Sequence, residues 1–594
     1  MTFMLNFDLV IICYFIAPFV VFVFLRDQSG KEWKAGYTFF RWYFFIVFSI
    51  CSLICAADIP FFIQFGSHLN KTIFNWSGNT GFVTKLIFSN ISYWGYLLLF
   101  LLMCILFYRF LKQIFSNVII EKRSTGRGAS IVLFILLGLF TFIGIRGRTS
   151  PKSPILAGTA FFCEYPFFNQ AGLNPCFVFF NDLMEKDQTR PFLLEGYSDT
   201  DLKRSMWQLT TTKYYTQGEK NERIYECNSP AKNYNVVIVL MESMSISKLG
   251  YYGSQNLAPS LDSIAQAGLF FDHFYSSGIH TFNGLFATST GFPSIMDEHP
   301  LNTYTDRSMK GIAYWLKKQN YSTYFFTSHD PQFDNMEGFF KTNNFDEVLS
   351  EDDMPSEEAL GPMGIPDHHL FDFVLEKIDR HEKEKKNAPF LSFVLTASDH
   401  GPWEIPADIP FKPGAASKQD KATQYADWSI GQFIRKAKTR EWFNNTLFIF
   451  VADHGGYYGF TYAMPLSYNH IPCVFYMPSA IQPDTISSVG GQIDVLPTLM
   501  GFMNIPFTNR SMGIDLRREV RPCMYFTADN KIGCIDEKDY YYELMDEQKE
   551  EFFDYRQLDL TNRIDENRGK ADSMKSYSRN MIRTARYILK NKLY

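Results

Sequence analysis

The first 150 residues hold four long apolar runs, and these constrain the fold more than any other feature of the sequence. The runs occupy residues 7–25, 42–65, 92–110 and 129–146. Each is close to the roughly 20 residues that a helix needs to cross a bilayer. Four such runs in succession, separated by polar breaks, predict a multi-pass membrane domain over residues 1–147 rather than buried helices of a soluble core.

The basic residues between the runs predict which way this domain is oriented. The loops after the first and third runs are rich in Lys and Arg, whereas the loop between the second and third has only Lys71 and Lys85. Because basic loops stay in the cytoplasm, the N-terminus and everything after residue 147 are predicted to lie outside. A cleaved signal peptide is disfavoured, since no basic segment precedes the first run. We therefore expect a cell-membrane protein with an extracytoplasmic main domain.

From residue 234 onward, short apolar runs rich in β-branched and aromatic residues alternate with helical segments. Buried strands are predicted at 235–240, 322–328, 389–398, 446–453 and 471–478, and helices at 258–268, 309–319 and 425–438. This alternation predicts a mainly parallel sheet with helices on both faces. We expect a main domain at 232–560 and a C-terminal basic helix at 561–594. Residues 148–231 are expected to be a connector that lies on the membrane surface or covers the main domain.

Charge and cysteine content narrow the classes of protein and site. The net charge is −5 and no long basic tract occurs, which argues against a nucleic-acid partner. No cysteine after residue 147 has the CxxC spacing of a zinc site. Cys523 and Cys534 flank a predicted hairpin, "MYFTADNKIG", and are candidates for a local disulfide. Cys163 and Cys176 are a second candidate pair.

Polar residues follow three of the predicted strands, at the point where each strand ends. Glu242 comes after "NVVIVLM", Asp453 and His454 after "LFIFVA", and Asp399 and His400 after "FLSFVLTAS". Ligands of parallel α/β sheets bind beyond the carboxyl ends of the strands, so these side chains are expected to converge on one rim. Carboxylates and imidazoles are suitable ligands for a divalent ion such as Mn²⁺, Zn²⁺ or Mg²⁺.

Several stretches resemble a known family, in the order in which that family has them. They are "VVIVLMES", "YYGSQNLAPSLDSIAQAGLFFDHFYSSGIHT", "VADHGG" and "GGQIDVLPTL", within residues 232–520. Together they are similar to the lipoteichoic acid synthase branch of the alkaline phosphatase and sulfatase superfamily. The resemblance implies that superfamily's fold behind a multi-span domain. That family usually has one more span than this chain shows, which favours a further span upstream.

The resemblance also implies the roles of the site residues. Thr281 matches the family's nucleophile, which is also a metal ligand, beside residues matching Glu242, Asp453 and His454. One divalent ion is implied, Mn²⁺ in preference to Zn²⁺ or Mg²⁺. Coordination to a metal favours the nucleophilic alkoxide form of a hydroxyl. A helix after Thr281 would offer N–H groups to a phosphate oxygen. His400 matches a substrate-contacting histidine that could steady the phosphoryl group or protonate a leaving oxygen. The alternative is a structural histidine in a Gly-Pro turn.

Other polar residues near the motif have alternative interpretations. Ser276 and Ser277 are expected to close the preceding strand rather than to act as nucleophiles. His470 could serve a second metal, although a structural role is favoured. The sequence "GIHTFNGL" lacks the Pro and Arg of the C/S-x-P-x-R motif, so a sulfatase that uses formylglycine is disfavoured.

One segment departs from the family pattern. Where lipoteichoic acid synthases carry a Trp and, two residues on, an Arg that hold glycerol phosphate, this chain has Asp334 and Met336. Asp334 and its neighbour Asn335 are the residues expected to contact the headgroup here. A carboxylate at that place favours an amine-bearing donor such as phosphatidylethanolamine over phosphatidylglycerol. The alternative is that Asp334 merely caps the following helix.

The sequence therefore predicts a metal-dependent transferase. It would move a phosphorylated headgroup, phosphoglycerol or phosphoethanolamine, from a membrane phospholipid to a cell-envelope glycan or lipid. One alternative is a phosphodiesterase or sulfatase-like hydrolase that uses no acceptor. Another is a non-catalytic binding or sensing protein on the same fold, which the complete set of Glu242, Thr281, Asp453 and His454 disfavours.

Overall fold

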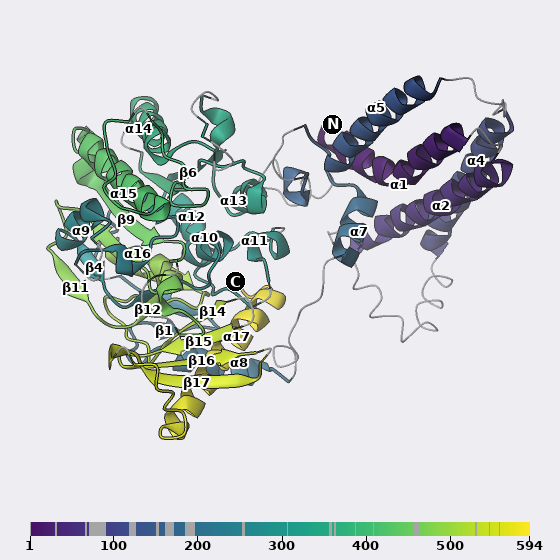
Figure 1. Cartoon of the computed structure of the whole chain (residues 1–594). Coiled ribbons are helices and arrows are strands. Elements are labelled where there is room, and N and C mark those ends of the chain that lie inside the picture. The colour runs from purple at the N-terminus through teal and green to yellow at the C-terminus, as the bar shows by residue number, and fades with distance from the viewer. Residues whose placement is uncertain are drawn as a thin grey trace. The chain divides into compact units, whose positions relative to one another are not determined.

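The computed structural model divides the chain into two compact units, Met1–Asp187 and Gln188–Tyr594 (Figure 1). It describes all residues except 1, 30–32, 66–67, 70–90, 118–125, 150–153, 161–171, 185–195, 228, 252–255, 297, 306, 356–358, 361–363, 387, 408, 457, 459–461, 529–530, 546 and 558. Each unit is described by itself below.

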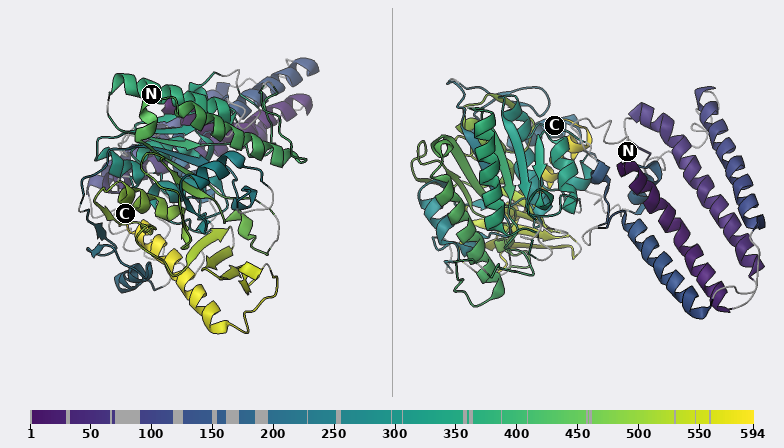
Figure 2. Two further views of the ribbon diagram at one scale, coloured as in Figure 1. Left: turned by 90° about the vertical axis from the view of Figure 1, so that its left-hand side faces the viewer. Right: turned by 90° about the horizontal axis from the view of Figure 1, so that it is seen from above.

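The first unit contains the four predicted apolar helices. They are α1 (Thr2–Ser29), α2 (Lys34–Phe65), α4 (Ile91–Asn117) and α5 (Arg127–Arg146). All four are long and apolar enough to cross a membrane. Helix α1 packs against α5, and α2 packs against α4 (Figure 2). The short helix α7 (Pro175–Met184) contacts both α1 and α2. Large apolar side chains such as Leu98 and Phe140 point outward, as lipid-facing residues do.

The second unit is built on an eight-stranded sheet of order β11-β4-β10-β9-β3-β8-β6-β7. Five consecutive strands of this sheet are parallel to one another: β9, β3, β8, β6 and β7. The strands span Leu269–Phe271 (β4), Asp484–Ile486 (β11), Cys473–Tyr476 (β10), Thr446–Ala452 (β9), Asn235–Met241 (β3), Phe390–Leu395 (β8), Ser322–Thr327 (β6) and Glu347–Leu349 (β7). Every residue of β3 is buried, which fits a strand covered on both faces. The predicted mainly parallel sheet is confirmed, with β10 antiparallel to both of its neighbours.

Helices cover both faces of this sheet (Figure 2). On one face α9 (Pro259–Gln266), α14 (Asp367–Glu384) and α15 (Lys418–Ala437) pack side by side. On the other lie α10 (Thr281–Thr290), α12 (Ile312–Lys317) and α16 (Val495–Phe502). Helix α13 (Met336–Thr342) follows β6. The predicted helices at 258–268, 309–319 and 425–438 correspond to α9, α12 and the second half of α15.

A second, antiparallel sheet completes this unit. Its strands are β14 (Met524–Ala528), β15 (Lys531–Ile535), β16 (Asp539–Leu544) and β17 (Lys549–Asp554), and α17 (Arg568–Lys590) packs across them. Helix α8 (Asp199–Gln208) packs on α17, and β2 (Arg223–Tyr225) pairs with β13 (Phe507–Asn509).

The structure therefore differs from the predicted division at residues 231 and 560. Leu202 and Met206 of α8 are fully buried, and Arg223 donates to the carbonyl oxygens of Ser511 and Gly513 at 2.8 and 2.7 Å. Because these contacts join residues about 300 positions apart, the sequence pattern around each one does not reveal them. Residues 199–225 and 568–590 are thus part of the same compact unit as the eight-stranded sheet.

The predicted hairpin is present, but its predicted disulfide is wrong. Strands β14 and β15 pair in antiparallel register, with Tyr525 opposite Cys534. Cys523 is therefore offset from Cys534 rather than directly across from it, and both are free thiols. Cys163 lies outside the described residues, and Cys176 is a free thiol in the first unit.

Candidate metal and nucleophile site

Two acidic residues meet where neighbouring parallel strands end. Strand β3 pairs with β9 in a register that sets Met241 opposite Ala452. Glu242 and Asp453 are the next residues on each strand, so their side chains reach the same rim. His454 follows at once, and one ligand atom from each of the three residues lies within 4.8 Å of the other two.

Helix α10 brings Thr281 to this cluster. Thr281 is the first residue of the helix, and its Oγ1 donates a hydrogen bond to Glu242 Oε2 at 3.2 Å. Gly284, one turn on, allows the close approach, because a Cβ there would lie 2.6 Å from the Asp453 backbone. The Asn283 N–H already donates to the His280 carbonyl oxygen at 2.9 Å, so the N–H groups of Thr281 and Phe282, which precede the first hydrogen bond of α10, are the ones that can face an anion.

The hydrogen bonds around the acids leave one oxygen without a partner. Asp453 Oδ1 accepts from the backbone N–H groups of Ser243 and His454 at 2.9 and 2.6 Å. Asp453 Oδ2 is buried and makes no hydrogen bond with any residue that the structure describes. His454 Nε2 lies 3.5 Å from this oxygen and 3.7 Å from Glu242 Oε1. A buried carboxylate oxygen without a donor is costly unless a cation occupies the space beside it.

The electrostatics of the cluster also fit a cation. Burial raises the pKa of the Asp453 carboxyl, and burial together with the adjacent Asp453 raises that of Glu242. Burial lowers the pKa of His454, which favours the neutral imidazole that binds metals. Two carboxylates, an imidazole and a hydroxyl form a donor set that suits a divalent ion. The residues therefore fit one divalent metal, and the geometry does not distinguish Mn²⁺ from Zn²⁺ or Mg²⁺.

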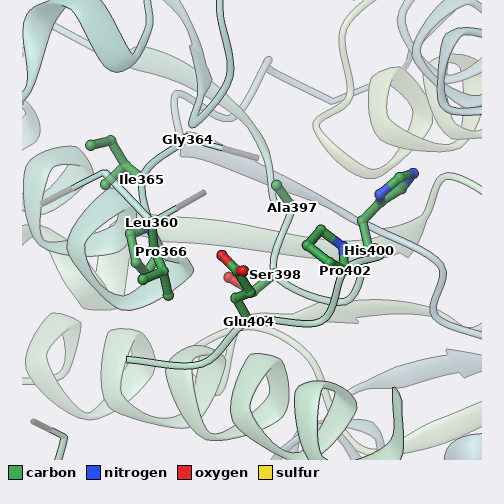
Figure 3. A pocket seen from close by; sticks show the side chains of 9 residues that line it. All are labelled: Leu360, Gly364, Ile365, Pro366, Ala397, Ser398, His400, Pro402 and Glu404. Carbon is green, nitrogen blue, oxygen red and sulfur yellow. The ribbon is translucent and has the colours of Figure 1, made fainter. Parts of the chain in front are cut away.

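Asp399 and His400, the two residues predicted at the end of the third strand, lie in different surroundings. Asp399 is fully buried and pairs with Lys248 Nζ at 2.6 Å, with Thr423 Oγ1 also in hydrogen-bond contact. It does not join the metal cluster. His400 is exposed, and its Nδ1 lies 2.7 Å from the Gly401 carbonyl oxygen. Its ring points away from the other side chains around the small pocket that it helps to line (Figure 3), although its charge affects the pKa of Glu242 and of His454.

The two predicted headgroup residues differ in what they contact. Asn335 is buried, and its Nδ2 donates to the Leu301 carbonyl oxygen and to Thr305 Oγ1 at 2.9 and 2.7 Å. It therefore holds a neighbouring loop in place. Asp334 Oδ1 lies 3.3 Å from His299 Nε2. Asp334 does not cap α13, because that helix begins at Met336 and no side chain caps it.

The remaining candidates hold the local structure together. Ser276 Oγ donates to the Gly278 carbonyl oxygen at 2.8 Å, and Ser277 Oγ accepts from the Ser294 N–H at 2.6 Å. Both serines are fully buried. His470 Nε2 donates to the Asp272 carbonyl oxygen at 2.7 Å, and its ring stacks on Tyr275. These contacts give each of the three side chains a structural role, and none of them needs a ligand to explain its position.

The sequence reasoning missed several residues of the rim. Lys248 lies in a short 3-10 turn after β3, where no periodic pattern marks it as the partner of Asp399. His299 lies between α10 and α13, and its ring stacks on Phe282 at 3.9 Å. His329 and Asp330 follow the end of β6, so the strand-end rule applied to that strand would have drawn attention to them.

Comparison with known proteins shows which proteins this unit is similar to. Residues 234–505 match the family model described as Sulfatase, and this range contains Glu242, Thr281, His400, Asp453 and His454. Named relatives and solved structures are similar to the same part of the chain. This range is just under half of the chain, and over it the chain is similar to the lipoteichoic acid synthase-like branch of the alkaline phosphatase superfamily.

The curated relatives are distant in sequence. "Lipoteichoic acid synthase-like YvgJ" of Bacillus subtilis is 23% identical over 54% of this chain and 54% of its own length. "Lipoteichoic acid synthase 1" of the same organism is 22% identical over 77% of this chain and 72% of its own. "Phosphoglycerol transferase I" of Citrobacter koseri is 23% identical over 38% of this chain and 31% of its own. The match thus spans about half of the length of YvgJ and about a third of the transferase.

Solved structures support the fold. An alkaline phosphatase superfamily protein from Vibrio parahaemolyticus matches with a TM-score of 0.60 and 24% identity, over 67% of this chain and 98% of its own. The lipoteichoic acid synthase LtaP from Listeria monocytogenes matches with a TM-score of 0.52 and 18% identity, over 66% of this chain and 98% of its own. The predicted fold class is therefore confirmed.

Proposed function

We propose that this chain is a membrane-anchored, metal-dependent transferase. It moves a phosphorylated headgroup from a membrane phospholipid to a cell-envelope glycan or lipid, with Thr281 as the nucleophile. The observation that carries the proposal is the position of Thr281 Oγ1, at the start of a helix and 3.2 Å from Glu242 Oε2. Beside it lies the partnerless Oδ2 of Asp453. The names of the curated relatives support the same class of reaction.

Glu242, Thr281, Asp453 and His454 would hold the ion, which supplies Lewis-acid activation of a hydroxyl and neutralises charge on phosphate. In the first step Thr281 Oγ1 gives up its proton to solvent and attacks phosphorus, and the bond from phosphorus to the glycerol oxygen of the lipid breaks. The leaving oxygen takes a proton and departs as diacylglycerol, and the headgroup phosphate stays on Thr281. The N-terminus of α10 stabilises the phosphate oxygens. His400 is the residue proposed to donate the proton.

In the second step an acceptor hydroxyl attacks the same phosphorus. The bond to Thr281 Oγ breaks, the acceptor loses its proton, and Thr281 regains one. If water attacks instead, the outcome is hydrolysis. The fate of the headgroup therefore separates the transferase from the hydrolase alternative.

The choice of headgroup rests on Asp334. A carboxylate there still favours an ammonium group, as in phosphoethanolamine, over phosphoglycerol. His299, however, lies 3.3 Å from Asp334 and already offers it a positive partner when protonated. We therefore expect only a modest preference between the two headgroups.

The proposal also requires the catalytic unit to face the lipids of the outer leaflet. Basic residues after the first and third spans favour a cytoplasmic position for those loops. Reporter fusions after residues 33 and 120 should then report cytoplasm, and a fusion after residue 200 should report the outside. A cytoplasmic signal at residue 200 would contradict the proposal.

The activity test uses the purified full chain in proteoliposomes with Mn²⁺. Phosphatidylglycerol or phosphatidylethanolamine labelled in the headgroup is supplied, with and without an acceptor glycolipid. We expect diacylglycerol release, a label trapped on Thr281, and transfer of that label to the acceptor. Release of free headgroup phosphate alone would favour the hydrolase. Absence of turnover with either lipid, from protein that has bound metal, would refute the proposal.

A further inference from the structure

The membrane unit contains a cavity of about 460 Å³ between α1, α2, α4 and the start of α7. Its walls are mainly apolar, and Ile12, Leu99 and Met103 are 41–51% exposed, so the cavity opens on the lipid-facing side. Asp8 of α1, Cys51, Cys55 and Ala56 of α2, and Asn174 and Cys176 at the start of α7 are among the residues that line it. A space of this kind inside a bilayer is suited to an acyl chain, because no water is available to fill it.

An acidic residue lies in the wall of this apolar cavity. Asp8 belongs to α1, within the span Leu5–Ser29. Asn174 Nδ2 donates to Asp8 Oδ1 at 2.6 Å, while Asn174 Oδ1 accepts from the Phe177 N–H at 3.0 Å. The amide is thereby fixed at the start of α7, and Asp8 Oδ2 makes no hydrogen bond with the residues that the structure describes. An ionisable side chain within a membrane span is costly and marks a functional site.

We propose that this cavity binds diacylglycerol. One acyl chain occupies the apolar space, and the free hydroxyl of the lipid donates a hydrogen bond to Asp8. Asp8 selects the occupant: its second side-chain oxygen can accept a hydrogen bond from an alcohol, whereas the phosphate of an intact phospholipid has no hydrogen to donate. The proposal rests on the proposed function, in which diacylglycerol is the product left in the membrane. The membrane unit then acts as a product-binding site as well as an anchor.

The cavity has native chemical reporters. Cys51 and Cys55 lie one turn apart on α2, and Cys55 Sγ is 3.8 Å from Cys176 Sγ. Cys176 Sγ is also 3.5 Å from the Cys51 carbonyl oxygen. All three thiols line the cavity, so an occupying lipid chain should slow their reaction with a small apolar thiol reagent.

The experiment uses the full chain in nanodiscs that contain photoactivatable diacylglycerol or photoactivatable phosphatidylglycerol at equal mole fraction. Adducts are mapped by mass spectrometry. We expect diacylglycerol to label the cavity-lining segments of α1, α2 and α4 about tenfold more than phosphatidylglycerol does, which is the preference that one additional hydrogen bond gives. Added diacylglycerol should also protect the three thiols. Equal labelling by the two lipids would overturn the proposal.

Two variants and a control sharpen the result. Asp8→Leu should remove the preference for diacylglycerol, and Ala56→Phe should reduce labelling by filling the cavity. Leu98→Phe, on α4 at a position 67% exposed and outside the cavity, is the matched control and should behave as wild type. Labelling of Ala56→Phe at the wild-type level would contradict the proposal.

Headgroup release is measured on the same preparations. Because diacylglycerol is supplied from outside, absence of release would refute the proposed transferase while the labelling still tests the cavity. Conversely, normal release with equal labelling would refute only the cavity proposal. A variant that fails to reach the membrane is recognised by loss of both readouts, and the thiol protection of the wild-type chain then decides the question.

Discussion

The sequence contains the tripeptide Asp-His-Gly twice, at 399–401 and 453–455, and the structure uses the two copies differently. Both follow strands that flank β3 in the sheet. Asp399 is buried against Lys248 at 2.6 Å, whereas Asp453 lies beside a second carboxylate, Glu242, and keeps one oxygen without a partner. Identical local sequence thus gives a structural ion pair in one place and a candidate metal site in the other. The difference lies in the charge that a distant segment supplies.

The charges of the two places explain this contrast. Burial alone would lower the pKa of Lys248, but Asp399 beside it raises that pKa. Burial likewise raises the pKa of Asp399, and the positive charge of Lys248 opposes that rise. At the other copy, burial raises the pKa of both Asp453 and Glu242. The cluster has no Lys or Arg, and burial lowers the pKa of His454, its one basic member. In a buried ion pair each charge compensates the other, whereas two adjacent buried carboxylates need a cation to compensate their charge.

The largest expected effect is on chemistry at the cluster around Asp453. Thr281→Ala should lower headgroup release by roughly 10³-fold or more, because the nucleophile is removed. The change should leave substantial bound metal, since the acids and His454 remain. Thr281→Ser, which keeps a hydroxyl, is the matched control and should retain part of the activity. Release by Thr281→Ala close to the wild-type rate would contradict the role of this residue.

The next effect concerns stability at the cluster around Asp399. Asp399→Ala should destabilise the fold by about 3–5 kcal/mol, because it leaves the buried Lys248 without its acidic partner. The exposed pair Lys436–Asp372 is the control, with side chains 45% and 41% exposed. Asp372→Ala should cost at most about 1 kcal/mol. Urea unfolding of the full chain in detergent measures both, and equal losses would show that burial of the Lys248 pair has no special weight.

A smaller effect on headgroup release is expected from His400, the histidine of the first tripeptide. His400→Gln should lower release by roughly 10²-fold if His400 protonates the leaving oxygen. The loss should shrink for a synthetic donor with a nitrophenyl leaving group, which needs no proton. An equal loss with both donors would indicate that His400 binds substrate rather than supplies a proton.

The smallest expected effect is on the choice of headgroup. Asp334→Asn should change the ratio of phosphatidylethanolamine to phosphatidylglycerol turnover by roughly threefold, less than a fully formed ion pair would give, because His299 shares the carboxylate. His299→Gln, which removes that partner, should raise the preference for the ammonium headgroup. Equal loss with both lipids in Asp334→Asn would assign Asp334 a structural role only.

The comparison of the two tripeptides also shows how far sequence reasoning reaches. The strand-end rule brought Glu242, Asp453 and His454 to one rim because β3 and β9 are adjacent and parallel, which apolar runs and their spacing do predict. The same rule predicts Asp399 as a metal ligand as well, because nothing in the sequence near residue 399 indicates that Lys248 is its partner. The position of Thr281 came from family resemblance rather than from its neighbours.

Features that depend on contacts between distant segments could not be predicted, because such contacts leave no local sequence pattern. Strand β2 reaches its partner β13 across nearly 300 residues, so residues 199–225 were assigned to a connector. The offset of Cys523 from Cys534 depends on hairpin register, which the flanking positions of two cysteines do not fix. Asp334 gained its partner from a loop between α10 and α13, where His299 has no periodic neighbours.

Metal content of the purified chain tests the central claim most directly. Wild type, Asp453→Asn and Asp399→Asn are dialysed with Mn²⁺, and bound metal per folded chain is measured by elemental analysis. Asparagine at 453 can still accept the two backbone hydrogen bonds to Oδ1, so only the charge and the partnerless oxygen are lost. The account predicts bound metal in wild type and in folded Asp399→Asn, and its loss in Asp453→Asn. Full metal content in Asp453→Asn, or loss of metal only in Asp399→Asn, would contradict it.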